Sequence, residues 1–332
     1  HVYGWQSEYN YRMIGSCTKY LFEDFKRIEN LAPITNENRP HDIKPRFYIT
    51  VHDTGDSDPK HNAKFWSEAV KNMSWEQGRY ECSYQYVVGN DGIYHNIPDN
   101  EVAWHAGDST QFDYKLYDTY VTGDNKNPDI DISDDGYYTI DGEKTVILAP
   151  RAYKKNRSGD VIIDRFCTKE DFNSQGILCK LIDGKYYIGE TYFNSGYEKI
   201  ANRGGNNNSI GIESCINEGS DIHLTWQRTA KLVSHLLKEN NLSLGDIKQH
   251  HYFSGKNCPQ TMRMNDLWDY FISLVEVESC VLRFLDQGYK IDLIPISSNI
   301  LPNGRITNLD EEVKFIIRTT LNGETEELEF SI

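Results

Sequence analysis

The segment from His250 to Pro259 carries the residues of this chain that are best suited to chemistry. It places an imidazole at His250 and a thiol at Cys258, on either side of a glycine-containing loop. Such a loop can fold back and bring the two side chains to one point. His52, which ends a different predicted strand, could supply a third metal ligand. Three protein ligands leave one tetrahedral position for water, which is the pattern of catalytic zinc sites, and zinc lowers the pKa of that water to about 7.

The same residues allow plainer interpretations. The chain has 10 histidines, so one histidine near one cysteine is unremarkable. His52 and His250 could be ordinary hydrogen-bonded residues, with Cys258 a buried thiol. Alternatively, Cys258 could be the nucleophile of a peptidase that uses His250 as its base. A zincin protease is disfavoured, because the sequence has no His-Glu-x-x-His motif.

Short apolar and β-branched runs predict the strands that would position these side chains. Apolar residues at helical spacing predict helices between the strands, and Thr225 is the expected N-cap of one helix. Together they predict an α/β fold, in which a central mixed β-sheet is flanked by helices. The predicted strands are 47–51, 84–88, 209–213 and 247–249, and the predicted helices are 18–30, 61–73, one from 225 and one from about 265.

Two further regions differ in character from this core. Residues 108–205 are rich in Tyr, Asp, Gly and Asn and hold only short alternating runs, which predicts a β-rich insertion far longer than a loop. A bridge between Cys167 and Cys179 is conceivable there. From about Ser279 the pattern is all-β and includes a type I′ hairpin turn at Leu321–Glu324. The expected parts are an N-terminal helix and linker (1–40), a central domain (41–277) with the insertion (108–205), and a small C-terminal all-β module (278–332).

The composition excludes some classes of function. The chain of 332 residues has 35 basic and 50 acidic side chains, a net charge of −15, so most of its surface would repel nucleic acid. No stretch approaches the roughly 20 apolar residues that span a bilayer, so no membrane span is expected. The sequence begins at His1, and a signal peptide would lie outside it. Nothing in the sequence indicates the oligomeric state.

In four segments the chain resembles the zinc amidases of the N-acetylmuramoyl-L-alanine amidase type 2 superfamily, which includes phage endolysins, bacterial autolysins and peptidoglycan recognition proteins. The segments occur in the family's order, and with their linking helices they cover somewhat under half of the chain. The resemblance implies a zinc-dependent hydrolase that cuts the amide between N-acetylmuramic acid and L-alanine in bacterial peptidoglycan, and therefore a secreted or cell-wall location. The segments are ITVHDTG (Ile49–Gly55), SYQYVVGNDGIYHNIPDNEVAWHAGD (Ser83–Asp108), NNNSIGIE (Asn206–Glu213) and IKQHHYFSGKNCP (Ile247–Pro259).

The resemblance also implies a set of metal ligands. His52, His250 and Cys258 match the three zinc ligands of the family. His250 is preferred over His251 because it keeps the family's spacing to Gly-Lys-Asn-Cys-Pro. In addition, a shift of one residue in a strand turns a side chain to the other face. His251 remains the alternative ligand.

Three residues match catalytic positions in different branches of the family. Glu213 matches a glutamate that would move the proton from water to the leaving nitrogen. Tyr84 matches a tyrosine near the metal, and Lys256 matches a lysine that would face the developing oxyanion. Each also has a plain alternative: Glu213 could pin a loop, Tyr84 could belong to the core, and Lys256 could be a solvated charge.

Further residues are expected to contact the substrate. His105 and Trp104, in Trp-His-Ala-Gly, match the substrate side of the family's cleft, and Asn208 is expected to shape the start of a strand beside it. Gln85 departs from a histidine that is often found in related lysins, so no catalytic role is assigned to it. The insertion departs as well, and we expect it to form one wall of the substrate groove.

The main rival function is a non-catalytic module that binds peptidoglycan on the same fold. Members of the superfamily without activity commonly lack the cysteine ligand. Cys258 is present here, which favours an enzyme.

Overall fold

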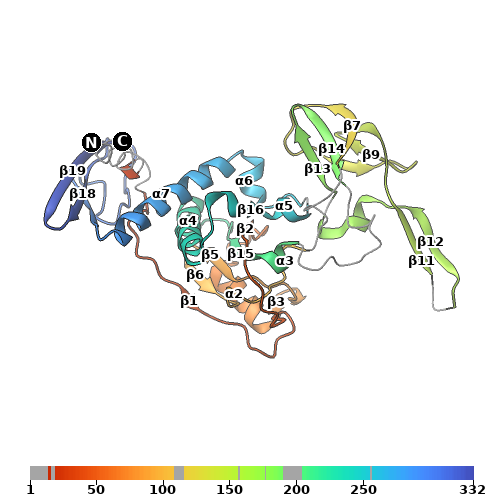
Figure 1. The fold of residues 1–332 in the computed structure, drawn as a ribbon, viewed down its shortest axis with the longest axis horizontal. Helices are drawn as coiled ribbons and strands as arrows, with labels where there is room; N and C mark the ends of the chain where they lie inside the picture. Colours follow the sequence, from red (N-terminus) through yellow and green to blue (C-terminus); the bar gives the residue numbers. More distant parts are fainter. Residues whose placement is uncertain are drawn as a thin grey trace.

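The structure is a computed structural model that describes residues 14–15, 19–107, 116–155, 158–175, 177–189, 204–254 and 256–332. Three parts follow one another along the longest axis of the molecule (Figure 1). A central α/β domain lies between the β-rich insertion at one end and a three-stranded β-sheet at the other. The predicted fold class is confirmed.

The central domain is built on a six-stranded mixed sheet. Most neighbouring strands run parallel, and the exception is the antiparallel β5–β6 hairpin, which turns at Asn90 and Asp91. The four predicted strands form the middle and one edge of this sheet. The order across the sheet is β1 (Ile28–Glu29), β6 (Gly92–His95), β5 (Tyr86–Gly89), β15 (Ser209–Ser214), β2 (Tyr48–Asp53) and β16 (Ile247–Gln249).

Helices cover both faces of this sheet. The long helices α4 (Ile222–Glu239) and α7 (Trp268–Asp286) pack together on one face, and α2 (Ala63–Asn72) packs on the other. The N-cap of α4 is Asp221, not Thr225, because the Asp221 carboxylate accepts the backbone N–H groups of the first turn. Within the described residues, no helix is long and apolar enough to cross a bilayer. The short elements are α3 (Gly204–Asn208), α5 (His250–Ser254), α6 (Gln260–Met264) and the hairpin β3 (Ser74–Trp75) with β4 (Gly78–Arg79).

The helix predicted at 18–30 is wrong for the described part of that segment. Residues from 19 onward form a turn and then an extended chain that ends in β1. The apolar side chains of the segment are buried in separate places: Leu21 packs with the C-terminal module, whereas Phe25 packs against the central core. A helix would present these side chains to a single surface, so an extended course buries them better.

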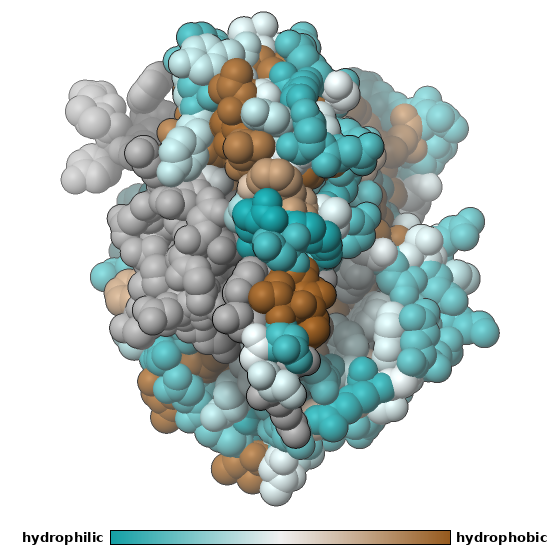
Figure 2. Space-filling view, turned by 90° about the vertical axis from the view of Figure 1, so that its right-hand side faces the viewer, coloured by the Kyte–Doolittle hydropathy of each residue, from teal (hydrophilic) through white to brown (hydrophobic). Residues whose placement is uncertain are grey.

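The insertion is β-rich, as predicted. Its strands form three small sheets around their own apolar clusters. Cys167 and Cys179 are both free, so the conceivable bridge between them is not formed. The surface at this end of the molecule is largely hydrophilic, with separate apolar patches (Figure 2). The strands are β7 (Leu116–Thr122), β8 (Ile130–Ile132), β9 (Tyr137–Ile140), β10 (Glu143–Leu148), β11 (Arg151–Lys155), β12 (Val161–Phe166), β13 (Cys179–Ile182) and β14 (Lys185–Gly189), with the 3-10 helix Lys169–Gln175 between β12 and β13.

The C-terminal sheet begins later than the sequence suggests. Because α7 continues to Asp286, the predicted boundary at 278 falls inside a helix, and the sheet starts at Lys290. Its last hairpin turns at Asn322 and Gly323, whose φ angles of 51° and 87° are those of the predicted type I′ turn. The sheet consists of β17 (Lys290–Pro295), β18 (Lys314–Leu321) and β19 (Glu324–Ser331).

Candidate metal centre

Alternation along two neighbouring strands separates the core from the candidate site. Val51 in β2 and Ile212 in β15 belong to the apolar cluster beneath α4 and α7. His52 and Glu213, the next residues in each strand, therefore point to the opposite face. They are also partners in the β2–β15 register, so their side chains emerge next to each other. They lie near the carboxyl ends of parallel strands, where open α/β sheets commonly bind ligands.

The three predicted metal ligands meet at this point. One donor atom each of His52, His250 and Cys258 lies within 4.8 Å of the others, and all three residues are buried. His52 Nδ1 is 3.6 Å from Cys258 Sγ. Ligand atoms of a tetrahedral zinc ion lie about 3.3–3.8 Å apart, given bonds of about 2.0–2.3 Å, so this spacing suits the metal.

Local hydrogen bonds fold the ligand loop back on itself. His250 is the first residue of α5 rather than the end of the preceding strand. The Cys258 carbonyl accepts the backbone N–H of His251 at 3.1 Å, and the Cys258 N–H donates to the Lys256 carbonyl at 2.7 Å. His251 is outside the three-residue cluster, so the structure favours His250 as the ligand.

The electrostatics of the cluster also fit a divalent cation. Burial lowers the pKa of both His52 and His250 well below the ordinary value, so both are neutral and able to donate a lone pair. Burial raises the pKa of the Cys258 thiol, and a thiolate at this position therefore needs a compensating positive charge. Nδ1 of His250 and Oε2 of Glu213 are buried without a hydrogen-bond partner among the described residues. Two imidazoles and one thiol form a donor set that suits zinc.

Glu213 lies beside the cluster. Its Oε1 is 3.7 Å from His52 Nδ1. Burial raises the pKa of Glu213 to about 8, the Lys256 ammonium opposes this rise, and the Asp53 carboxylate adds to it. A carboxyl group with such a pKa can both accept and release a proton near neutral pH.

Lys256 is a basic residue whose charge acts on the titratable groups of this site. Its side chain is exposed, and its charge lowers the pKa of His52, His250 and Glu213. Within the described chain we find no ion pair or hydrogen bond of its ammonium group. Lys256 is therefore placed to act on a negative charge that develops at the cluster.

The sequence model of the family described as N-acetylmuramoyl-L-alanine amidase matches residues 44–261, well over half of the chain. The chain belongs to this amidase family. The matched range holds the three candidate metal ligands, Glu213 and Lys256, together with the whole insertion.

Two curated amidases of Bacillus subtilis (strain 168) are similar to this chain. N-acetylmuramoyl-L-alanine amidase CwlH is 22% identical over 245 residues, which are 74% of this chain and 59% of CwlH. N-acetylmuramoyl-L-alanine amidase XlyA is 22% identical over 244 residues, 74% of this chain and 49% of XlyA. The chain thus matches only part of the length of these relatives.

Solved structures also align with this chain. The catalytic domain of XlyA aligns with a TM-score of 0.43 at 22% identity and covers 75% of this chain and 99% of that domain. PlyL aligns with a TM-score of 0.41 at 16% identity and covers 76% of this chain and 97% of PlyL.

Tyr84, predicted to be catalytic, is bound within the core of the central domain. Its ring is buried in the apolar cluster beneath α2, and its hydroxyl donates to the carbonyl of Trp66 at 3.1 Å. A group that stabilises an oxyanion must direct its hydrogen at the reacting oxygen. The hydroxyl of Tyr84 is directed at the helix instead, so the geometry does not support the catalytic assignment.

The three predicted substrate residues lie in different environments. Trp104 is 40% exposed, and its contact with substrate stays a prediction. Nδ1 of His105 lies 2.9 Å from Nε2 of His52, directly against a metal-ligand candidate. Asn208 is buried, and its amide donates to the carbonyl of Gly204 at 2.9 Å, so it stabilises the start of β15 and is not exposed to substrate.

Gln85 supports the scaffold rather than the chemistry. Its amide nitrogen donates to the Glu101 carbonyl at 2.7 Å, and its amide oxygen accepts the N–H of Gly211 at 2.7 Å. It thereby connects β15 to the chain that leads to His105. These bonds are consistent with the expectation that Gln85 has no catalytic role.

The sequence did not reveal the importance of Arg263 in α6. Its guanidinium donates to Asn257 at 2.9 Å, to Gln249 at 2.5 Å and to Asn127 of the insertion at 3.0 Å. Asn257 and Gln249 directly precede two of the metal-ligand candidates. One side chain thus connects both ligand-bearing segments to the insertion. The only available signal was an arginine soon after Cys-Pro, which does not identify its partners.

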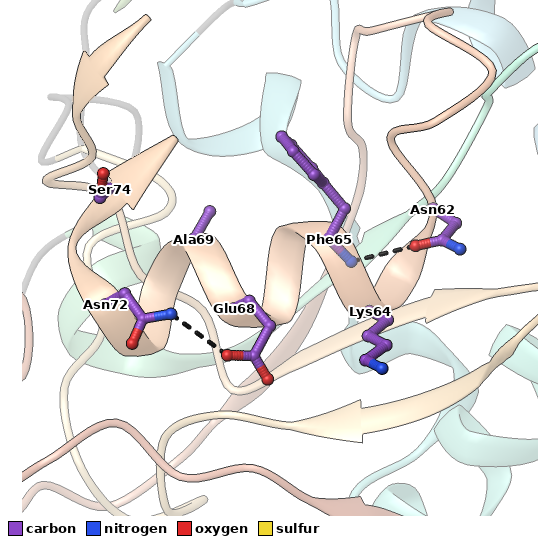
Figure 3. Close-up of a pocket in the computed structure, with 7 residues that line it drawn as sticks. All are labelled: Asn62, Lys64, Phe65, Glu68, Ala69, Asn72 and Ser74. Atoms are coloured by element: carbon purple, nitrogen blue, oxygen red, sulfur yellow. Dashed lines mark hydrogen bonds between the residues drawn. The ribbon is translucent and has the colours of Figure 1, made fainter. Parts of the chain in front are cut away.

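An open groove along α2 is separate from the metal cluster. It is lined by residues of α2 and its two ends, and it contains none of the three metal-ligand candidates. Its polar side chains largely bond to one another or to the helix: Asn72 donates to Glu68, and Asn62 accepts the N–H of Phe65 as the N-cap of α2 (Figure 3). We assign no role in catalysis to this groove.

Proposed function

We propose that this chain is a zinc-dependent peptidoglycan amidase that hydrolyses the bond between N-acetylmuramic acid and the L-alanine of the stem peptide. The proposal is carried by the convergence of His52, His250 and Cys258 on one point, with Glu213 beside them, in a member of the amidase family. The two B. subtilis relatives carry the same activity in their names.

The residues at and around the cluster have separate roles in amide hydrolysis. His52, His250 and Cys258 would hold a zinc ion, which activates a water molecule and polarises the lactyl carbonyl when it is bound. Glu213 takes a proton from the attacking water and passes it to the L-alanine nitrogen as the C–N bond breaks. The exposed ammonium of Lys256 stabilises the negative charge on the carbonyl oxygen.

The surroundings of the cluster would bind the polymer. Trp104, which is 40% exposed and precedes His105 in the sequence, offers an aromatic face to the polymer. The insertion is connected to the ligand loop through Arg263 and to the segment that follows α6 through an ion pair of 2.7 Å between Lys126 and Asp266. We propose that this connection makes the insertion one wall of the substrate groove. A substrate of this kind lies outside the bacterial membrane, which implies a secreted or lytic setting.

Digestion of purified cell wall tests this proposal. Mass spectrometry of the products should show free stem peptides that begin at L-alanine, together with intact glycan strands. A chelator should abolish these products and added zinc should restore them. Zinc binding without any released peptide would instead indicate a non-catalytic peptidoglycan-binding module. Activity that survives the chelator but is lost on thiol alkylation would indicate a cysteine peptidase.

A further inference from the structure

His105 lies in direct contact with the first metal-ligand candidate. Its Nδ1 is 2.9 Å from Nε2 of His52, and the two rings are nearly perpendicular, with an interplanar angle of 89°. The other nitrogen of His52, Nδ1, is the one that faces Cys258 Sγ and Glu213 Oε1. His52 thus presents one nitrogen to the cluster and the other to His105.

This geometry determines where the protons lie when a metal is bound. A neutral imidazole carries one N–H, so a lone pair on Nδ1 of His52 requires the proton on Nε2. Nε2–H must then donate to Nδ1 of His105, which in turn places the proton of His105 on its own Nε2. A hydrogen bond of this kind fixes both the tautomer and the ring orientation of a metal ligand.

The protein holds His105 in place from two sides. Its ring lies against Gly211 of β15, where a Cβ atom would approach the ring to 2.5 Å. From the other side, the Asn206 side-chain oxygen accepts the backbone N–H of His105 at 2.8 Å and that of Ala106 at 2.7 Å. The absence of a side chain at Gly211 is therefore needed for His105 to reach His52.

We propose that His105 is a positioning residue for the metal ligand His52, and that its main role is to accept the Nε2–H of His52 so that Nδ1 is aimed at the metal. This inference rests on the proposed zinc site. It replaces the expectation that His105 acts mainly by contact with the substrate.

Two substitutions at this position separate the proposed role from simple packing. His105→Asn retains an acceptor oxygen close to the position of Nδ1, whereas His105→Phe retains a planar ring but has no acceptor. We expect His105→Phe to raise the zinc Kd about 10–100-fold and His105→Asn to stay close to wild type, measured by competition with a chromophoric chelator. For both variants, the KM for soluble muropeptide at saturating zinc should stay close to that of wild type.

A substitution in β15, at the glycine that lies against the His105 ring, gives an independent test. Gly211→Ala should displace the His105 ring and weaken zinc binding in the same direction as His105→Phe. Gly245→Ala is the matched control, because its Cβ would meet only the Ser243 hydroxyl at an ordinary 3.6 Å.

The possible outcomes distinguish this inference from the proposal on which it rests. If wild type binds zinc but His105→Phe binds it equally tightly, the positioning role is wrong. A raised KM for muropeptide with an unchanged zinc Kd would mean that His105 contacts the substrate instead. If wild type binds no zinc at all, the zinc site itself fails. Circular dichroism of each variant shows whether it is folded.

Discussion

Glu213 combines a largely enclosed side chain, 15% exposed, with a chemical group that water normally stabilises. Its side chain lies next to His52 on a strand whose alternate residues form the core, and burial raises its pKa to about 8. Such a carboxyl group would be a poor structural charge, because it carries its charge only part of the time at neutral pH. A bound zinc ion would lower this pKa and favour the carboxylate that accepts a proton from water.

At the residue scale, we expect Glu213→Gln to lose hydrolysis and to keep the metal. The amide side chain has nearly the same shape but cannot take a proton, so kcat on soluble muropeptide should fall about 10²–10⁴-fold. Zinc content, measured by mass spectrometry of dialysed protein, should not change. Glu218→Gln, at an exposed position, is the control and should retain full activity. Full activity in Glu213→Gln would mean that another group moves the proton.

At the element scale, the ligand loop depends on α6. Arg263 connects Gln249, Asn257 and the insertion residue Asn127 through three hydrogen bonds. Planar, multidentate contacts of this kind are particular to arginine. Without them, the segments that carry two of the metal ligands would lose three of the hydrogen bonds that fix them to each other and to the insertion.

We therefore expect Arg263→Met to weaken zinc binding several-fold and to expose the insertion to limited proteolysis. Asp266→Asn is the control, because it removes only the exposed ion pair with Lys126, and exposed pairs contribute about 0–1 kcal/mol. Equal protease resistance in wild type and both variants would show that the insertion is held by other contacts.

The central elements were predictable from sequence because each repeats a simple pattern. In Tyr48–Asp53 and Ser209–Ser214 apolar residues recur at every second position, so the strands followed from the sequence pattern, whereas the role of Glu213 followed from the resemblance to the amidase family. The helix predicted at 18–30 was wrong because the apolar residues of this segment match a helical stripe by chance. In the structure they are buried in different apolar clusters. The role of Arg263 could not be predicted, since its partners are distant in sequence and meet only in the fold.

At the scale of the whole molecule, a buried charge network joins two helices of the central domain to the N-terminal segment. Lys231 in α4 is 2.9 Å from Glu278 in α7, and it also donates to the carbonyl of Leu21 at 2.8 Å. Gln227 donates to the second oxygen of Glu278 at 2.6 Å. The network lies where α4, α7 and the N-terminal segment meet.

Lys231→Met should leave the Glu278 carboxylate buried without its cation and destabilise the protein by about 3–5 kcal/mol in urea unfolding. The double variant Lys231→Met with Glu278→Leu should recover much of that loss, since no charge is then left unpaired. Lys238→Met, which removes the exposed pair with Asp286, should cost less than about 1 kcal/mol. If Lys231→Met costs no more than Lys238→Met, the network has no role in stability.

The attachment of the N-terminal segment should depend on pH through His95. Burial alone would lower the pKa of His95, but hydrogen bonds to Asp99 and to Glu29 of β1 outweigh it and raise the pKa. A raised pKa means that the stabilisation is complete below the unfolded-state value of about 6.5 and is lost as the pH rises through the folded-state value.

The difference in unfolding free energy between wild type and His95→Gln should therefore be larger at pH 5.5 than at pH 9. At pH 5.5 we expect it to be about 1 kcal/mol at most, because Glu29 is exposed. A difference that grows with pH would contradict the direction of the shift.

X-ray absorption at the zinc edge of the purified protein tests the central claim most directly. We expect two nitrogen neighbours at about 2.0–2.1 Å and one sulfur neighbour at about 2.3 Å, together with an oxygen from water. Cys258→Ser should remove the sulfur signal, whereas His251→Asn should leave the spectrum unchanged. A zinc ion without a sulfur neighbour, or a sulfur signal that persists in Cys258→Ser, would contradict the proposed metal centre.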